Sequence, residues 1–341
     1  MGVQFSGVIP AREVELTELS GRKIAVDAYN CIYQFLSIIR DRMTGELLKD
    51  SKGRVTSHLS GLLYRTSNLI EAGIKPVFVF DGEPPVFKKK TIEARQAARD
   101  EAKRKWMEAV ERGEEAIKYA QAASHFTEEM VVDSKKLLEI MGVPWVQAKS
   151  EGEMQCAYMC KKGDVWASAS QDYDSILVGS PRLIRNLSIS GRRKVPKKDE
   201  YVEIKPEIIE FDKVLAELGI TKEQLIIVGI LIGTDYAEGV KGIGPKTALK
   251  IVAKYRTLQR VLENVEWIDE ISAEEIYEFF LKPPVVNKYG LEWKQVDTDE
   301  MIKFMVDEHD FSRERVEKVI ERLQQSYVSG RQASLKGWFE K

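Results

Sequence analysis

Lys23-Ile-Ala-Val-Asp27 is a short apolar run that ends in an aspartate, and Pro76-Val-Phe-Val-Phe-Asp81 repeats the pattern. Runs of this length that are rich in β-branched and aromatic residues predict buried strands. Comparable runs occur at residues 144–146, 165–170 and 175–178, and each is followed by a helical pattern. This alternation predicts an α/β fold with a mainly parallel central sheet flanked by helices.

The composition indicates a globular protein. The chain has 341 residues, of which 43% are hydrophobic, enough for one large core or two smaller ones. It contains no run of about 18 apolar residues and no signal-peptide pattern. We therefore expect an intracellular protein without a membrane partner, cytoplasmic if the source is archaeal, and a monomer. Charged residues make up 31% of the chain, which is typical of thermophiles.

Sulfur and imidazole ligands are scarce. The cysteines Cys31, Cys156 and Cys160 follow no zinc-ligand spacing, and we interpret them as buried reduced thiols. The three histidines are scattered along the chain, which argues against a His-rich metal or acid–base site. Any metal ion in this protein must therefore be held by oxygen atoms.

Acidic residues stand where the predicted strands end. Asp27 and Asp81 each follow an apolar run, a position where a single aspartate is also a common helix N-cap or turn residue. Asp172 and Asp174 are spaced i, i+2 on an extended segment, so their carboxylates fall on one face, which is costly unless a cation lies between them. The carboxyl ends of the strands form the binding edge of an open α/β sheet, so these acids can converge.

Three further acids stand near helix ends. Ser150-Glu-Gly-Glu153 fits a capping box, with Ser150 as the N-cap, and this pattern explains Glu153 structurally. It leaves Glu151 unexplained, although both glutamates would crowd the same end of the helix. Asp235 follows the apolar helical stretch 225–232, where a simple turn is the alternative interpretation.

Seven acids that converge with few basic partners would repel one another, and hard cations with oxygen ligands are the general way to hold them together. Two Mg²⁺ ions, or Mn²⁺ in their place, about 3.5 to 4 Å apart would clamp both oxygens of an in-line phosphoryl displacement. The pattern therefore predicts a nuclease site with two metal ions. The seven acids are Asp27, Asp81, Glu151, Glu153, Asp172, Asp174 and Asp235.

Residues 88–122 are rich in Ala, Glu, Lys and Arg, which predicts helix. If continuous, this helix would span about 50 Å. Its few large apolar side chains indicate that it projects from the body, although a solvated surface helix with i, i+4 ion pairs is the alternative. Between Lys88 and Lys105 eight basic residues stand against three acidic ones, an excess that favours nucleic acid although the whole chain is near neutral.

The segment 239–248 contains Gly242 and Gly244, flanked by Lys241 and Lys246. Helix, tight glycine turn and helix are typical of a DNA-binding hairpin whose turn amides face a phosphate. A glycine turn between helices is common in proteins, so this feature alone leaves a purely structural role open. The flanking lysines favour contact with DNA. From residue 200 onward the pattern predicts helices.

Taken in order, these and other short motifs resemble the flap endonuclease family across essentially the whole chain. Each motif is weak alone, but their number and order are highly specific. The matching segments are Met1-Gly-Val, Val26-Asp27-Ala-Tyr, Tyr33-Gln-Phe-Leu36, Thr56-Ser-His-Leu59, Gly73-Ile-Lys-Pro-Val77, Phe80-Asp-Gly-Glu-Pro-Pro85, Ser150-Glu-Gly-Glu153, Asp172-Tyr-Asp174, Gly233-Thr-Asp-Tyr236 and Gly242-Ile-Gly-Pro-Lys246.

The resemblance implies a 5′ flap endonuclease with 5′–3′ exonuclease activity, which acts on branched DNA in lagging-strand replication and repair. It implies that the seven acids hold the metal ions, and that Lys88 and Arg95 contact the scissile phosphate. It also implies that Tyr33 stacks on the terminal nucleotide, and that the glycine hairpin binds duplex DNA with the help of a K⁺ ion. The chain departs from the family at Glu83, where Lys is common, and at Gly152, where Ala is frequent; neither departure alters a ligand.

The resemblance also divides the chain into parts. A nuclease core is expected at 1–260, a helical extension at 261–330 and a tail at 331–341. The core would contain a helical arch at about 84–130, through which the family threads or clamps the 5′ single strand, and the helical hairpin at about 225–255.

The tail resembles the peptide that docks the family onto the replication sliding clamp, the proliferating cell nuclear antigen. In one helical turn, three apolar side chains would share a face and enter one pocket, while a glutamine forms a hydrogen bond beside it. The alternative is a C-terminus that folds back on its own core. The four residues are Gln332, Leu335, Trp338 and Phe339.

Three other functions remain open at this point. A related 5′ exonuclease would share the acids, although the short arch and the tail argue against it. A non-catalytic binder of branched DNA would keep the basic residues but has no need for seven acids. A metal-dependent phosphatase would share the acids but not the glycine hairpin.

Overall fold

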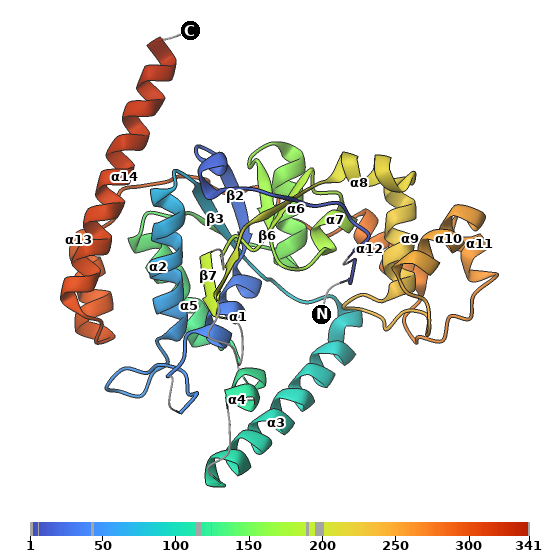
Figure 1. Ribbon diagram of the computed structural model, residues 1–341, viewed down its shortest axis with the longest axis horizontal. Helices are drawn as coiled ribbons and strands as arrows, with labels where there is room; N and C mark the ends of the chain where they lie inside the picture. The colour runs from blue at the N-terminus through green and yellow to red at the C-terminus, as the bar shows by residue number, and fades with distance from the viewer. Residues whose placement is uncertain are drawn as a thin grey trace.

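A central sheet carries helices on both faces, and helix α3 extends away from this body (Figure 1). Helix α14 lies at one end of the molecule and projects beyond it at its C-terminal end (Figure 1). The computed structural model describes residues 3–5, 7–41, 44–112, 117–123, 125–188, 191–194 and 201–339.

Seven strands form the central sheet in the order β1-β9-β6-β5-β2-β3-β4. The five strands from β6 to β4 are parallel to one another, whereas β9 pairs antiparallel with β6 and β1 pairs antiparallel with β9. Strands β7 and β8 form a separate antiparallel ribbon. The expected mainly parallel sheet is therefore confirmed. The strands are β1 (Arg12–Glu13), β2 (Lys23–Asp27), β3 (Lys75–Phe80), β4 (Trp145–Gln147), β5 (Ala167–Ala169), β6 (Arg182–Arg185), β7 (Gly191–Lys194), β8 (Tyr201–Ile204) and β9 (Glu207–Glu210).

Helices connect the parallel strands and continue after the sheet is complete. Several begin with a side-chain cap, as where Thr127 accepts a hydrogen bond from the amide of Met130. The helices are α1 (Ala28–Ile38), α2 (Ser57–Glu71), α3 (Lys89–Glu111), α4 (Ile117–Ala122), α5 (Glu128–Ile140), α6 (Gly152–Lys162), α7 (Asp174–Val178), α8 (Phe211–Leu218), α9 (Lys222–Ile232), α10 (Pro245–Tyr255), α11 (Leu258–Leu262), α12 (Ala273–Leu281), α13 (Thr298–Met301) and α14 (Arg313–Phe339), with the 3₁₀ turns η1 (Leu16–Leu19) and η2 (Val86–Lys88) and the π-helix η3 (Ile302–Glu308).

Alternation along β2 separates the two faces of the sheet. Ile24 and Val26 are buried in the core shared with α1, α2, α5 and α14, whereas Ala25 is buried in the core shared with α6. Val77 and Val79 of β3 lie on the α6 side as well. This explains why the strands read as continuous apolar runs, because a parallel sheet covered on both faces has no polar side.

A third core surrounds α9, whose residues from Leu225 to Leu231 are all buried. It packs against α7, α10 and α12. A helix that is apolar on every side requires such cover. The helices around α9 lie beside the central sheet, and the glycine turn connects α9 to α10 (Figure 1).

Two predictions about local structure were wrong. Residues 175–178 form helix α7 rather than a strand, because a short apolar run fits either state and Gly179, at a φ of 91°, ends the helix. The region after residue 200 begins with β8 and β9 rather than helix. The region 88–122, which was expected to be helical, contains the two helices α3 and α4, which pack against each other. All three cysteines are buried and free, as expected.

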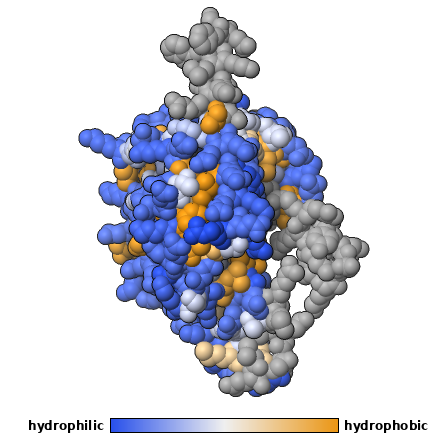
Figure 2. Space-filling model, turned by 90° about the vertical axis from the view of Figure 1, so that its left-hand side faces the viewer, coloured by the Kyte–Doolittle hydropathy of each residue, from blue (hydrophilic) through white to orange (hydrophobic). Residues whose placement is uncertain are grey.

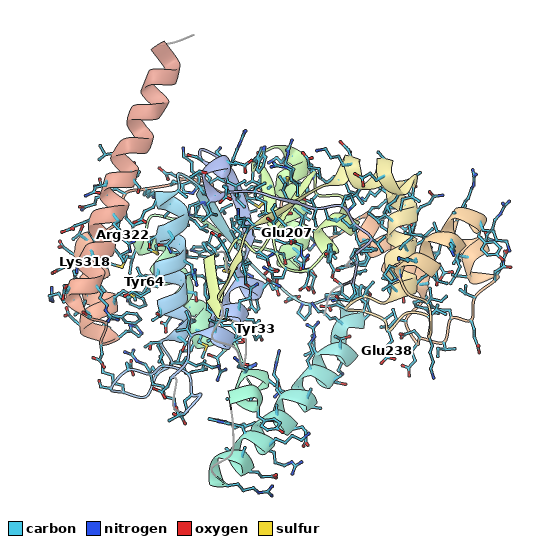
Figure 3. All side chains as sticks on the ribbon, in the orientation of Figure 1. Tyr33, Tyr64, Glu207, Glu238, Lys318 and Arg322 are labelled. Atoms are coloured by element: carbon cyan, nitrogen blue, oxygen red, sulfur yellow. The ribbon has the colours of Figure 1, made fainter. Side chains whose placement is uncertain are left out.

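Helix α14 packs on α2, and the Arg322 guanidinium lies 3.0 Å from the Glu71 carboxylate between them (Figure 3). Its backbone remains helical through residues 331–339, where a separate tail was expected. The face at this end of the molecule is mostly hydrophilic, with apolar residues exposed in narrow strips (Figure 2). Among the described helices, none is both long and apolar enough to cross a membrane.

Candidate active site

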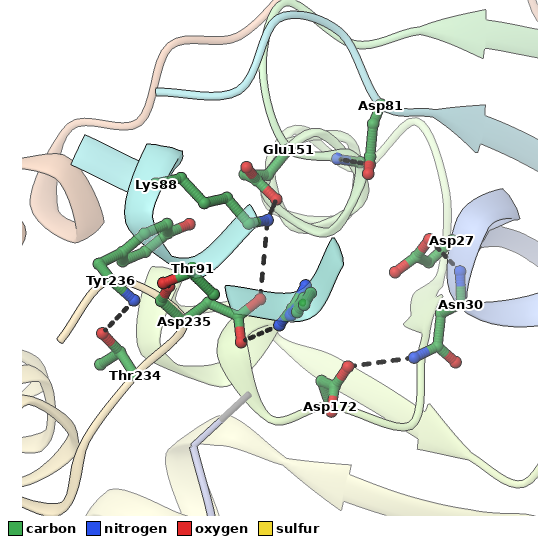
Figure 4. Close-up of polar contacts among 12 residues, drawn as sticks. Asp27, Asn30, Asp81, Lys88, Thr91, Glu151, Asp172, Thr234, Asp235 and Tyr236 are labelled. Carbon is green, nitrogen blue, oxygen red and sulfur yellow. Dashed lines mark hydrogen bonds and ion pairs between the residues drawn. The ribbon is translucent and has the colours of Figure 1, made fainter. Parts of the chain in front are cut away.

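The predicted acids converge at the carboxyl ends of the parallel strands. Asp27 closes β2, Asp81 follows β3, and Asp172 follows β5. Strand β2 lies between β3 and β5, which is where the order of the parallel strands reverses. Open α/β sheets bind ligands at this switch point, because the loops diverge there and leave a crevice. Glu151 reaches the same place from the N-terminal end of α6 (Figure 4).

Backbone amides hold two of these carboxylates. Asp27 caps α1, and its Oδ1 accepts a hydrogen bond from the amide of Asn30 at 3.0 Å. Asp81 Oδ1 accepts one from the amide of Gly152 at 2.7 Å, at the N-terminus of α6 (Figure 4). A helix N-terminus stabilises a carboxylate because its first amides have no partner within the helix. The N-cap role that was the alternative for Asp27 is therefore real, and it leaves Oδ2 near the site.

The predicted capping box at the start of α6 is absent. The helix begins one residue later than expected, with Glu151 as its N-cap and no side-chain cap. Ser150 Oγ and Glu153 Oε2 are buried without a hydrogen-bond partner among the described residues. The glutamate is therefore not engaged in capping, and its carboxylate remains to bind something else.

Gly152 permits the close contact between Asp81 and α6. A Cβ atom at this position would lie 2.8 Å from Asp81 Oδ1 and 3.1 Å from the carbonyl oxygen of Val79. An alanine would therefore force the Asp81 carboxylate to move. The glycine at this position therefore sets how tightly the Asp81 carboxylate can approach the helix.

Two basic residues at the base of α3 contact the acidic side chains. Lys88 Nζ lies 2.5 Å from Glu151 Oε2 and 3.6 Å from Asp235 Oδ2 (Figure 4). Arg95 donates to Asp235 Oδ1 at 2.7 Å, and Thr91 Oγ1 donates to the carbonyl oxygen of Asp235 at 2.6 Å. Lys88 and Arg95 therefore lie beside the acids, with both side chains bound to carboxylates.

Burial and mutual repulsion oppose ionisation of the acids. Burial, followed by the charge of Asp81, raises the pKa of Asp27 well above its usual value. Burial and the nearby Asp174 do the same for the pKa of Glu153. The pKa values of Asp81 and Asp174 are raised to about 7, in each case mainly by burial and then by a neighbouring acid. These acids therefore tend to keep their protons unless a cation compensates their charges.

Asp235 behaves in the opposite way. Although burial acts to raise it, the pKa of Asp235 is lowered to about 2 by neighbouring positive charges, Arg95 and Lys88 among them. Burial acts to lower the pKa of Lys88, but attraction to Glu151 and Asp235 raises it. The basic side chains therefore act as local counter-ions for Glu151 and Asp235, and no basic side chain among the described residues forms an ion pair with the other five acids.

The donor set fits hard divalent cations. Every donor group is a carboxylate, and hard cations such as Mg²⁺ prefer oxygen ligands. Among the described residues, Glu153 Oε2 is buried and has no hydrogen-bond partner, which a bound cation would supply. Within the part of the chain that the structure describes, no three acidic, histidine or cysteine side chains surround a single ion position. Several of the carboxylates contact Lys88, Arg95 or backbone amides instead.

A cavity of about 630 Å³ joins these groups. Six of the seven acids, Lys88, Arg95 and Tyr33 line it, while Asp174 lies behind and accepts a hydrogen bond from the amide of Val3 at 3.1 Å. Tyr33 lies on the part of α1 that faces α3 (Figure 3), where Arg99 donates to its hydroxyl at 3.1 Å. The cavity therefore combines acids, bases and an aromatic ring.

The other predicted residues lie elsewhere. Gly242 has a φ of 82°, a left-handed conformation that favours glycine, in the turn between α9 and α10. Gly244 caps α10, and Lys241 and Lys246 beside the turn are exposed. For the four tail residues the structure describes the backbone helix and not the side chains, so the proposed clamp contacts fall outside the described part.

Sequence reasoning missed Asn30 and Thr91. Asn30 Nδ2 donates to Asp172 Oδ2 at 3.1 Å (Figure 4), and Thr91 contacts the backbone of Asp235. Both contacts join segments that are far apart in the chain, so no local pattern could have revealed them.

Comparison with known proteins agrees with this geometry. The model of the XPG N-terminal domain matches residues 3–102, and that of the XPG I-region matches residues 142–235. The chain is 57% identical to flap endonuclease 1 of Pyrococcus horikoshii over 344 residues, which cover 100% of this chain and 99% of that protein.

Solved structures resemble it as well. The structure of flap endonuclease-1 from Methanococcus jannaschii is 40% identical, with a TM-score of 0.76, and the match covers 96% of this chain and 99% of that one. The catalytic core of Rad2 in complex with DNA substrate is 25% identical, with a TM-score of 0.69 over 92% of this chain and 96% of that one. The chain therefore belongs to the flap endonuclease family of XPG-type nucleases.

Proposed function

We propose that this protein is a structure-specific 5′ flap endonuclease, which hydrolyses a phosphodiester bond of branched DNA with the help of divalent cations. Members of its family are metal-dependent nucleases that act on DNA. The observation that carries the proposal is the convergence of seven carboxylates, Lys88 and Arg95 at the switch point of the sheet. A phosphatase or a passive DNA-binding protein would not account for these acids together with the hairpin.

The acids would hold two Mg²⁺ ions, with Mn²⁺ able to replace them. When bound, the ions supply an activated hydroxide and stabilise the leaving oxygen. Asp27 and Asp172 come from adjacent strands, whereas Glu151 and Glu153 come from α6, so the protein surrounds the ions from two sides. Asp235 adds a carboxylate that is already ionised, because its pKa is about 2.

Lys88 and Arg95 would bind the scissile phosphate. Both now pair with acids that the cations would take over, so each would be released toward an incoming phosphate oxygen. A positive charge held in place before the reaction stabilises the charge that grows on the phosphate. Lys88 suits this role because its side chain is only 10% exposed, so solvent screens its charge very little.

Tyr33 and the helices α3 and α4 would receive the 5′ strand. A second cavity of about 400 Å³ lies between α3 and the segment after α1, and it shares Arg99 and His125 with the acidic cavity. Lys103 and Trp106 also line it. Basic side chains track a nucleic-acid backbone and aromatic rings stack on bases, so the two cavities together suit a single strand.

The turn between α9 and α10 would bind the duplex part of the substrate. Gly244 stands at the N-terminus of α10, and a Cβ atom there or at Gly242 would meet no protein atom within 4 Å. The backbone is therefore open to a phosphate, and the helix N-terminus favours a negative charge. A K⁺ ion at this turn is part of the proposal.

The proposed role inside the cell is removal of 5′ flaps during lagging-strand replication and repair, with an accompanying 5′–3′ exonuclease activity. The tail would bind the sliding clamp through Gln332, Leu335, Trp338 and Phe339. The domain limits expected from the sequence are part of the same proposal, because each part would make a different contact with the substrate or the clamp.

The decisive test compares labelled 5′-flap, 3′-flap, nicked and plain duplex DNA, with Mg²⁺ and with EDTA. We expect cleavage of the 5′ flap near the branch, only with the cation, and none by Asp172→Asn. Preference for the nicked duplex would instead support a related 5′ exonuclease. Binding of every branched substrate without cleavage would overturn the enzymatic proposal.

A further inference from the structure

Asn30 lies between two carboxylates that come from different strands. It stands in the first turn of α1, three residues after Asp27, whereas Asp172 follows the neighbouring strand β5. Its side-chain Nδ2 donates to Asp172 Oδ2 at 3.1 Å, and its backbone amide donates to Asp27 Oδ1 at 3.0 Å (Figure 4). One residue therefore contacts both acids across the point where the strand order reverses.

The surrounding donors fix the orientation of the Asn30 side chain. Its Oδ1 accepts hydrogen bonds from the amide of Gln171 at 3.2 Å and from Gln34 Nε2 at 2.6 Å. A backbone amide can only donate, so Oδ1 must face Gln171 and Nδ2 must face Asp172. Ser188 Oγ donates to Gln34 Oε1 at 2.9 Å and extends the network to the segment after β6.

Asn30 is uncharged, which distinguishes it from Lys88 and Arg95. Those side chains compensate the charge of the acids that they contact, whereas an amide orients a carboxylate and leaves its negative charge in place. A hydrogen bond to one oxygen also restricts rotation of the carboxylate, so the other oxygen can meet a cation in a defined direction. Such partners of metal ligands commonly govern metal affinity.

We infer that Asn30 is a positioning residue, which holds Asp172 in a fixed relation to Asp27 so that both carboxylates face the same cation. This inference rests on the proposed function, since it assigns the two acids to a metal. The sequence alone could not reveal this role, because Asn30 contacts Gln171 and Asp172, which lie 141 and 142 positions away in the chain.

The first test measures Mn²⁺ binding to the free protein by titration calorimetry, without DNA. Asn30→Leu keeps a side chain of similar size but removes the donor and the acceptor, and Asn68→Leu provides a matched control on the exposed face of α2. We expect Asn30→Leu to weaken Mn²⁺ binding by roughly 10-fold or more, the usual effect of losing a partner of a metal ligand. Asn68→Leu should match the wild type. Equal Mn²⁺ affinity of Asn30→Leu and wild type would overturn the inference.

Asn30→Asp is the second test and decides the matter if Asn30→Leu fails to fold. It preserves the shape and the acceptor for the Gln171 amide, and it replaces the donor that faces Asp172 by a carboxylate oxygen that repels Asp172. Single-turnover cleavage of a 5′ flap at saturating Mg²⁺ should slow by roughly 10-fold or more, with the KM for DNA unchanged. An unchanged rate would show that only packing matters. If the wild type cut no flap at all, the proposed function would fail, while the Mn²⁺ comparison would still test Asn30.

Discussion

Asp174 provides a quantitative test of the electrostatics of the site. Its carboxylate is buried, and its pKa is raised to about 7 by burial and by the charges of Asp235 and Asp172. Replacing it by asparagine keeps the shape and the acceptor for the amide of Val3, but removes the titratable group. In the metal-free protein, we expect Asp174→Asn to be more stable than the wild type at pH 8. At pH 5 we expect this stability difference to be much smaller.

The sign and size follow from proton binding. Between pH 5 and pH 7 the unfolded chain has lost the proton from Asp174, whereas the folded protein keeps it, since its pKa is about 7. Because the folded protein binds one more proton than the unfolded chain in this range, the folded protein loses stability as the pH rises. The free energy of unfolding falls by about 1.4 kcal/mol for each pH unit, or about 3 kcal/mol over this range.

Urea denaturation in EDTA at pH 5 and pH 8 measures the effect as the stability difference between variant and wild type. Taking this difference removes the contributions of acids that do not interact with Asp174, whereas Glu153, whose pKa Asp174 raises, changes its titration together with the substitution. Asp212→Asn on the exposed face of α8 controls for the substitution itself. Excess Mg²⁺ should shrink the difference at pH 8, because a cation compensates the ionised group. A stability difference that is the same at pH 5 and pH 8 would refute the reasoning.

Four other changes test separate parts of the proposal. Asp172→Ala should abolish cleavage at saturating Mg²⁺ but leave DNA affinity largely intact, because the acid holds a cation and not a phosphate; wild-type turnover would contradict this. Lys88→Met should slow single-turnover cleavage by roughly 100-fold with little change in DNA affinity. Lys246→Ala should weaken duplex binding and reduce its salt slope by about 1, and an unchanged slope would exclude a phosphate contact. Deleting residues 331–341 should leave cleavage unchanged and remove clamp binding, whereas a lower melting temperature would favour a folded-back tail.

The strands that carry the acids could be predicted because their signals are local. A run such as that before Asp81 is apolar on both faces, and the acid follows directly. Periodicity could not separate α7 from a strand, since three apolar residues after Ser175 fit either conformation. The segment that begins with Asp174 was therefore assigned the wrong structure, and the metal-binding role of this acid stays a prediction. The prediction of a capping box was also wrong, since α6 begins one residue later and the amide of Gly152 donates to Asp81 from a distant segment.

The contacts among the acids could not be predicted in the same way. The sequence shows Lys88 and Arg95 in a basic run, but only the fold reveals that Glu151 and Asp235 are their partners. Asn30 follows Asp27 by three residues, which indicates a helix cap and nothing more. Its second contact depends on the neighbouring position of β5, and that position is set by the whole sheet.

The base of α3 connects the acidic cluster to the projecting helices. Lys88 contacts Glu151, and Arg95 and Thr91 both hold the segment that carries Asp235. A cation that binds these carboxylates competes with the basic side chains, whereas a phosphate competes with the carboxylates for the same side chains. If the cation binds the carboxylates and the phosphate binds the basic side chains, every buried charge is compensated. If only one of them binds, one buried charge lacks a partner, which is costly. Cation binding and DNA binding should therefore strengthen each other, with the N-terminal part of α3 as the element through which they are coupled.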